Sequence, residues 1–215
     1  KGFIMSIVTL NDRGVRSVTT FGSLSGGSMI FIKKLTASSS STLSFVNGSS
    51  DVVLDSTYKE YLFTFKDIHP SNRTRFQFNG SSDTGSNYNV TKTTTMFIAG
   101  HQETGADATL TYQSDDDLAQ STAFQDLAAY GDSEDEGNDA CLAGTLHLFN
   151  PSSTTFVKHF IARTNYMAAG GDSADYSVDS HMAGYFNTTS VIDAIQFKFT
   201  SNTIDAGDIC LYGIL

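Results

Sequence analysis

The sequence predicts an all-β protein: an antiparallel β-sandwich, jelly-roll-like, with an extended N-terminal arm. Three observations lead to this fold class. Charged residues make up only 17% of the chain, below the roughly 25% of an average soluble domain. The large apolar groups come from 16 Phe and 9 Tyr, with no Trp, and such residues favour strands. Short apolar–polar alternations separated by turn sequences recur, without the helix–strand alternation of a parallel α/β fold.

The first 28 residues differ from the rest of the chain. Residues 11–16 are polar, and residues 22–28 form a Gly/Ser stretch typical of a flexible linker. We therefore expect an N-terminal arm with its linker at residues 1–28 and a single β-sandwich domain at residues 29–215. The candidate partner-docking residues of the arm are Arg13, Arg16 and Phe21.

Strand patterns begin after the linker. The clearest is the segment in which Ile195, Phe197 and Phe199 alternate with polar residues, the period of two of a half-buried strand. A turn is expected at residues 47–50, an Asn-Gly-Ser-Ser sequence. The predicted strands are residues 29–35, 42–46, 61–66, 76–78, 88–99, 145–149, 155–163, 181–186, 192–200 and 209–214.

The middle of the chain, residues 100–143, has the least regular pattern. Residues 118–130 admit a short helix that would place Leu118, Phe124 and Leu127 on one face. Clusters of Gly, Ser and Asp bracket this segment and disfavour the helix.

Charge is distributed unevenly along the chain. The net charge is −10, which argues against nucleic acid as a partner, because phosphate binding requires a basic surface. No Lys or Arg lies between Lys92 and Lys158, where eleven acids accumulate, whereas bases predominate over residues 1–34. This asymmetry predicts either a solvated acidic loop or complementary docking between subunits. No apolar run approaches the length of a membrane helix.

No motif of an active site occurs. The chain has no GxSxG, HExxH, phosphate-binding loop or CxxC sequence, so we predict no enzymatic activity and no cofactor. The acidic loop lacks the spacing of an EF-hand, so a solvated loop is favoured over a cation site. The metal ligands of that weaker alternative would be Asp132, Glu134, Asp135 and Asp139.

Two pairs of residues leave alternatives open. Cys141 and Cys210 are either two thiols or one disulfide. His147 and His159 lie in predicted strands and could be neighbours across a sheet, although packed or polar sheet residues are favoured over metal ligands.

Aromatic residues in the loops suggest carbohydrate contacts, because exposed rings stack on sugars. The candidates are Tyr166 and Tyr176, within the loop predicted after residue 163. The absence of Trp weakens this interpretation.

Six segments carry a resemblance to a known group of proteins. Together they lie within residues 30–215, and none contains a catalytic motif. The segments are residues 55–61 (DSTYKEY), 83–90 (DTGSNYNV), 148–160 (LFNPSSTTFVKHF), 183–189 (AGYFNTT), 192–199 (IDAIQFKF) and 204–214 (IDAGDICLYGI). In these segments the chain resembles virion structural proteins of tailed phages that infect marine bacteria.

The resemblance implies a sandwich displayed on the virion as a capsid decoration or as a head-fibre or tail-fibre-type subunit. Its partners would be other virion proteins of the capsid or tail, with the arm as anchor, and a homo-oligomer is expected, a trimer being favoured. The alternative is a host-surface or glycan-binding adhesion module of a tail fibre. A polysaccharide-degrading enzyme is a third and weaker hypothesis, because no catalytic Asp can be nominated.

Overall fold

The computed structural model describes residues 28–128, 137, 141–168 and 175–215. These residues form strands joined by turns and loops, and contain no helix. The strands are β1 (Met29–Thr36), β2 (Leu43–Val46), β3 (Glu60–Pro70), β4 (Phe76–Ser81), β5 (Lys92–Gln102), β6 (Ala108–Tyr112), β7 (Gln125–Asp126), β8 (Leu142–Phe149), β9 (Lys158–Ala168), β10 (Tyr176–Phe186), β11 (Ala194–Phe199) and β12 (Ile204–Ile214).

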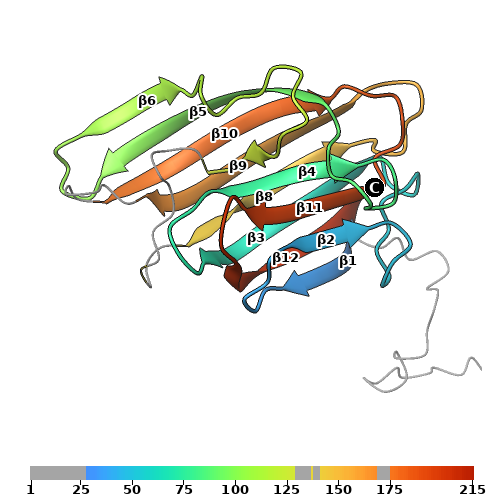
Figure 1. The fold of residues 1–215 in the computed structure, drawn as a ribbon, viewed down its shortest axis with the longest axis horizontal. Helices are drawn as coiled ribbons and strands as arrows, with labels where there is room; N and C mark the ends of the chain where they lie inside the picture. The colour runs from blue at the N-terminus through green and yellow to red at the C-terminus, as the bar shows by residue number, and fades with distance from the viewer. Residues whose placement is uncertain (1–27, 129–136, 138–140, 169–174) are drawn as a thin grey trace, which may run out of the picture.

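The strands form two antiparallel sheets that pack as a sandwich. The larger sheet has eight strands in the order β1-β12-β3-β8-β9-β10-β5-β6, and the smaller has four in the order β2-β11-β4-β7. Figure 1 shows the smaller sheet in front of one part of the larger sheet, with β5 and β6 extending beyond it. The predicted all-β sandwich is confirmed, while the jelly-roll detail stays a prediction.

Side chains alternate between the two faces of the eight-stranded sheet. In β9 each residue from Lys158 to Tyr166 is alternately buried and exposed, and β5 follows the same pattern. We call the face against the smaller sheet the inner face and the opposite one the outer face. Because strand side chains point to opposite sides in turn, every strand contributes to both faces.

The core is built around the ring of Phe197 in β11. Its neighbours on the inner face of the larger sheet are Phe63 and Phe65, with ring centroids 5.3 and 5.2 Å away, both edge-to-face. Phe45, Phe76 and Phe78 surround it within the smaller sheet. Edge-to-face packing is a favourable geometry for aromatic rings, so the alternating Phe residues of the sequence account for the aromatic centre of the core.

Two buried lysines fasten loops to the ends of the central strands. Lys92 in β5 and Lys158 in β9 flank Phe186 of β10 from either side. Both side chains are buried. The Lys92 Nζ donates to the carbonyls of Val90 and Ala123, and the Lys158 Nζ donates to those of Thr188 and Ser190. Each lysine therefore replaces its water shell with loop carbonyls.

The region from residue 100 differs most from the sequence prediction. Residues 118–128 form no helix, because Leu118 and Ser121 pair through their backbones with Thr94 and Lys92 of β5 instead. The Leu118 amide also donates to the Thr94 hydroxyl. β6 and β7 were not predicted, because both strands are short and lie near residues 114–117, a Ser- and Asp-rich segment typical of a loop.

The two cysteines are free thiols, which settles the alternative left open by the sequence. Cys210 lies in β12 and Cys141 immediately precedes β8, and β3 lies between these two strands in the sheet. Residues 1–27 of the predicted arm, with Arg13, Arg16 and Phe21, lie outside the described residues, as do Asp132, Glu134, Asp135 and Asp139.

Candidate functional site

The outer face of the eight-stranded sheet carries a concentration of apolar and aromatic side chains. Among the described residues, all exposed large hydrophobic residues except Phe156 and Leu215 lie on it, at between 45% and 75% exposure. Those on the outer face are Met29, Phe31, Phe97, Leu110, Tyr112 and Ile161.

The strand register aligns these side chains in rows across the sheet. One row passes from Phe31 through Tyr212, Leu62, His147, Ile161 and Ala183 to Thr95. A second row ends with His181, Phe97 and Tyr112. The Phe31 and Tyr212 rings are 5.6 Å apart, and Phe97 stacks on His181 at 4.8 Å. The aromatic residues therefore form two clusters, one on β1 and β12 and one on β10, β5 and β6, and Leu62 and Ile161 lie between them.

Carboxylates on this face are paired with bases. Arg163 donates from Nε and Nη2 to the two oxygens of Asp179, at 2.9 and 2.7 Å. This hydrogen bonding lowers the pKa of Asp179 below its usual value. Glu60 pairs with His147 at 2.5 Å, and Asp208 pairs with Lys34 at 3.1 Å. Although the chain carries a net charge of −10, its outer face is close to neutral.

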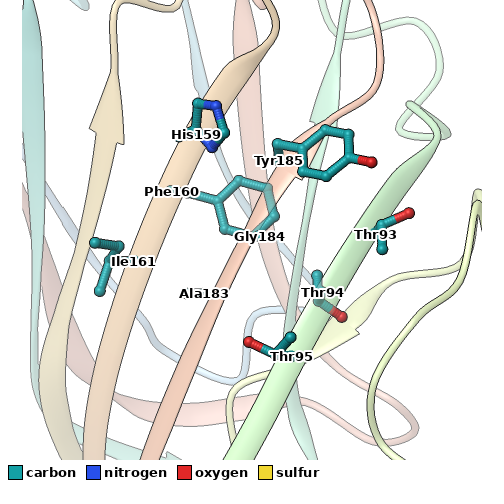
Figure 2. A pocket seen from close by; sticks show the side chains of 9 residues that line it. All are labelled: Thr93, Thr94, Thr95, His159, Phe160, Ile161, Ala183, Gly184 and Tyr185. Atoms are coloured by element: carbon teal, nitrogen blue, oxygen red, sulfur yellow. The ribbon is translucent and has the colours of Figure 1, made fainter.

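An open depression lies over the C-terminal end of β10 on the outer face (Figure 2). Its volume is about 440 Å³. It exists because β10 presents the small side chain of Ala183 there, which leaves the backbone around Gly184 uncovered. A Cβ at residue 184 would stand 2.6 Å from the Thr93 carbonyl oxygen, so the close approach of β5 requires glycine.

The walls of the depression come from the two neighbouring strands. His159 and Ile161 of β9 stand on one side and Thr93 and Thr95 of β5 on the other. The Tyr185 ring closes one end, 5.8 Å from the His159 ring. The lining contains no carboxylate, so the pair of acids needed for glycoside hydrolysis does not exist in this depression.

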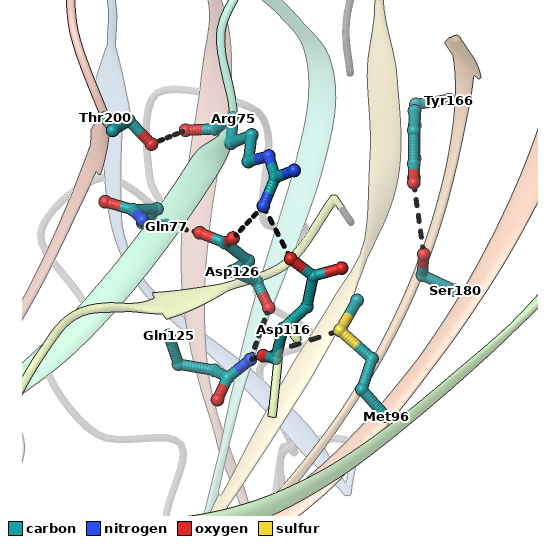
Figure 3. Close-up of polar contacts among 9 residues, drawn as sticks. All are labelled: Arg75, Gln77, Met96, Asp116, Gln125, Asp126, Tyr166, Ser180 and Thr200. Atoms are coloured by element: carbon teal, nitrogen blue, oxygen red, sulfur yellow. Dashed lines mark hydrogen bonds and ion pairs between the residues drawn. The ribbon is translucent and has the colours of Figure 1, made fainter. Parts of the chain in front are cut away.

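A second polar cluster lies at the border of the smaller sheet (Figure 3). Arg75 donates through Nη1 to Asp116 at 2.5 Å and to Asp126 at 3.1 Å. Gln77 donates to the other oxygen of Asp126, and Gln125 donates to the carbonyls of Asp116 and Asp126. Burial raises the pKa of both carboxylates, and the Arg75 charge opposes that rise. This cluster fastens the loop before β7 to β4.

The structure corrects the predicted glycan contacts. Tyr166 and Tyr176 are 1% and 9% exposed, and both point to the inner side of the sheet. Their hydroxyls are bonded within the protein, Tyr166 to Ser180 and Tyr176 to Asp107. They lie inside strands β9 and β10 rather than in a loop, so strand alternation buries them and leaves no ring face for a sugar.

The apolar outer face was not predicted from the sequence. The signal was present in Met96, Phe97 and Ile98, an apolar run without alternation, which is typical of a strand covered on both faces. His147 and His159 do lie on neighbouring strands, both on the outer face, with His147 opposite Ile161. Among the described residues no group of three or more His, Cys, Asp or Glu could hold a metal ion.

No protein-family model, curated protein or solved structure matches this chain. The resemblance to phage virion proteins therefore stays a prediction from the sequence. In the part of the chain that the structure describes, no helix is long and apolar enough to cross a membrane.

Proposed function

We propose that this chain is a non-enzymatic structural protein of a virus particle, which packs the outer face of its eight-stranded sheet against another protein subunit. The observation that carries the proposal is the set of exposed aromatic and apolar side chains that the strand register aligns across that face. Monomeric soluble proteins rarely expose large contiguous apolar patches, and such patches mark interaction sites.

The charge pattern of the outer face supports packing against protein. Interface cores are depleted in unpaired charge, because an ion that loses water without gaining a partner is costly. Arg163 and Asp179 already satisfy each other, as do Lys34 and Asp208. Covering them with a neighbouring subunit would leave no lone charge among these pairs.

The virion part of the proposal depends on the sequence resemblance. On that basis the protein is a capsid decoration or fibre subunit, and the arm of residues 1–28, with Arg13 and Arg16, anchors it to other capsid or tail proteins. The sandwich then faces its neighbours in the assembled particle.

Binding to particles that lack the protein tests this proposal. We expect the full chain to bind, the chain without residues 1–28 to lose binding, and Phe97→Ser to bind at least tenfold more weakly, about 1.4 kcal/mol. Phe156→Ser is the matched control, because Phe156 is 70% exposed but lies in the turn between β8 and β9. Equal binding by the two serine variants would refute the role of the outer face.

A glycan-binding adhesion module is the second candidate, favoured by the depression over β10. There Tyr185 supplies a ring, while Thr93, Thr95 and His159 supply polar groups, the combination that holds a sugar in an open site. Glycan-array binding by the full chain would support it, provided that Tyr185→Ala abolishes binding. Tyr112→Ala is the control, because Tyr112 is exposed on the same face outside the depression.

A further inference from the structure

The two edges of the eight-stranded sheet are protected to different degrees. β1 carries Lys33 and Lys34 and an irregularity in its register between Phe31 and Lys33. Charged residues and bulges are devices that prevent an edge strand from pairing with another chain. β6, at the opposite edge, has the sequence Ala-Thr-Leu-Thr-Tyr, with no charge, proline or bulge.

The hydrogen bonds of β6 show which of its backbone groups face outward. The Gln113 amide donates to the Met96 carbonyl, and the Gln102 amide donates to the Asp107 carbonyl. Because hydrogen-bonded and non-hydrogen-bonded pairs alternate in an antiparallel ladder, Thr109 and Thr111 point their backbone groups toward β5. The N–H and C=O groups of Ala108, Leu110 and Tyr112 therefore point away from the sheet. In the described part of the chain no hydrogen bond to these outward groups occurs.

We infer that β6 pairs with β6 of a second copy of this chain, antiparallel and about a two-fold axis at Leu110. This register places Leu110 opposite Leu110, and Ala108 opposite Tyr112, in the two copies. All outward N–H and C=O groups of these three residues then find partners, because the hydrogen-bonded positions of an antiparallel pair are again every second residue. A shift by one residue would place the inward groups of Thr109 or Thr111 at the junction and lose these bonds.

Side chains in this register are complementary as well. Leu110 is 75% exposed and Tyr112 is 53% exposed, and both belong to the outer face. Thr109 and Thr111, whose hydroxyls are 2.7 Å apart, would form cross-strand threonine pairs on the opposite side. Asp107 would face the neutral Gln113 of the other copy.

The net charge of the chain limits where a second copy can pair. Two copies with a net charge of −10 each repel one another, and the strand of residues 108–112 is a neutral place at which they can meet. The pairing would continue the sheet and its aromatic outer face from one copy to the next. This pairing does not depend on what the outer face binds. It predicts a two-fold contact, whereas a trimer was favoured from the sequence.

The test is the mass of the full chain in solution, measured by light scattering or sedimentation over a range of concentrations. We expect a reversible dimer of twice the 23.2 kDa chain mass. Leu110→Lys places like charges opposite each other at the two-fold axis and should weaken the dimer by about tenfold or more. Met29→Lys is the matched control at the other edge, where the replaced residue is 52% exposed, and should leave the dimer unchanged.

Oxidative crosslinking tests the register directly. In a variant with Cys141→Ser and Cys210→Ser, added Leu110→Cys should crosslink two copies, because hydrogen-bonded antiparallel partners have Cα atoms about 5.5 Å apart, within disulfide reach. Thr109→Cys is the control, since each residue 109 would face residue 111 and not its own counterpart. Crosslinking by Thr109→Cys but not by Leu110→Cys would overturn the register.

The remaining outcomes also decide the inference. A monomer at all concentrations would overturn it, whatever Leu110→Lys did to particle binding, because Leu110 also belongs to the outer face. A dimer weakened by Phe97→Ser and by Met29→Lys, but not by Leu110→Lys, would assign dimerisation to the outer face instead. Failure of particle binding with an intact dimer would refute the proposed function alone.

Discussion

The two faces of the eight-stranded sheet are made by the same strands, yet only one is covered within the molecule. On the inner face Phe63 and Phe65 are 0% and 4% exposed, whereas Phe97 and Ile161 on the outer face are 45% and 52% exposed. Both faces carry large apolar side chains. Apolar residues on the inner face therefore specify the fold, whereas those on the outer face remain available to bind a partner.

The largest difference between the faces should appear in the free energy of unfolding that is lost when an aromatic ring is removed. We expect Phe197→Ala to lower the free energy of unfolding by about 3–5 kcal/mol, because it empties the centre of the core. Phe97→Ala on the outer face should cost about 1 kcal/mol or less, since its ring is half in water. Urea unfolding of both variants measures this, and equal losses would contradict the comparison.

The buried ion cluster at the border of the smaller sheet should give the next largest effect. Arg75→Met leaves Asp116 and Asp126 without their cation, and we expect a loss of about 2 kcal/mol at pH 7. The loss is smaller than for a fully buried pair because the Arg75 side chain is 32% exposed. Lys66→Met, which breaks an exposed pair with Asp67, is the control and should leave stability unchanged.

The free energy of unfolding of Arg75→Met should approach that of the wild type as the pH falls. Burial already raises the pKa of Asp116 and Asp126 in the folded protein, and loss of the guanidinium raises both further. A raised folded-state pKa means that the folded chain binds protons more readily than the unfolded chain. The deficit of Arg75→Met should therefore shrink between pH 7 and pH 5, and a constant deficit would show that lost packing, not charge, is responsible.

A pH-dependent effect of similar size should come from Lys92. Burial lowers its pKa from 10.5 to about 7. Between these values the unfolded chain holds a proton that the folded chain has released, so stability should rise with pH by up to about 1 kcal/mol per pH unit. Unfolding at pH 7 to 9.5 should show this rise in the wild type and a shallower one in Lys92→Met. An unchanged slope would mean that Lys92 keeps its charge against the loop carbonyls.

The sequence predicted the fold where a strand is buried on one face only. Ile195, Phe197 and Phe199 alternate with polar residues, and they form β11 as expected. It did not predict β6, because Ala108 to Tyr112 follow an exposed turn and contribute no buried residue to the core. Edge strands of this kind are specified by pairing with a neighbour, which a local pattern does not contain.

The site could be predicted less well than the fold. Tyr166 was assigned to a loop on the expectation that the preceding strand ends at residue 163, whereas β9 continues to Ala168 and buries it. A difference of five residues in a boundary thus moves a ring from a surface loop into the core. The outer face depends on the order of eight strands, so its rows of aromatic residues could not be read from any one segment.

The smallest expected effect on stability concerns the surface ion pair of Arg163 and Asp179. The hydrogen bonds from Arg163 lower the pKa of Asp179, so the pair contributes stability above the usual Asp pKa and loses it as the pH falls through the lowered value. Because the Arg163 side chain is 65% exposed, Arg163→Met should change unfolding at pH 7 far less than Arg75→Met does. In an assembly that covers the outer face, however, the same variant would leave Asp179 buried and unpaired. Weak effects on unfolding combined with strong effects on particle binding would therefore show that the outer face is covered, whereas weak effects on both would leave this pair in solvent.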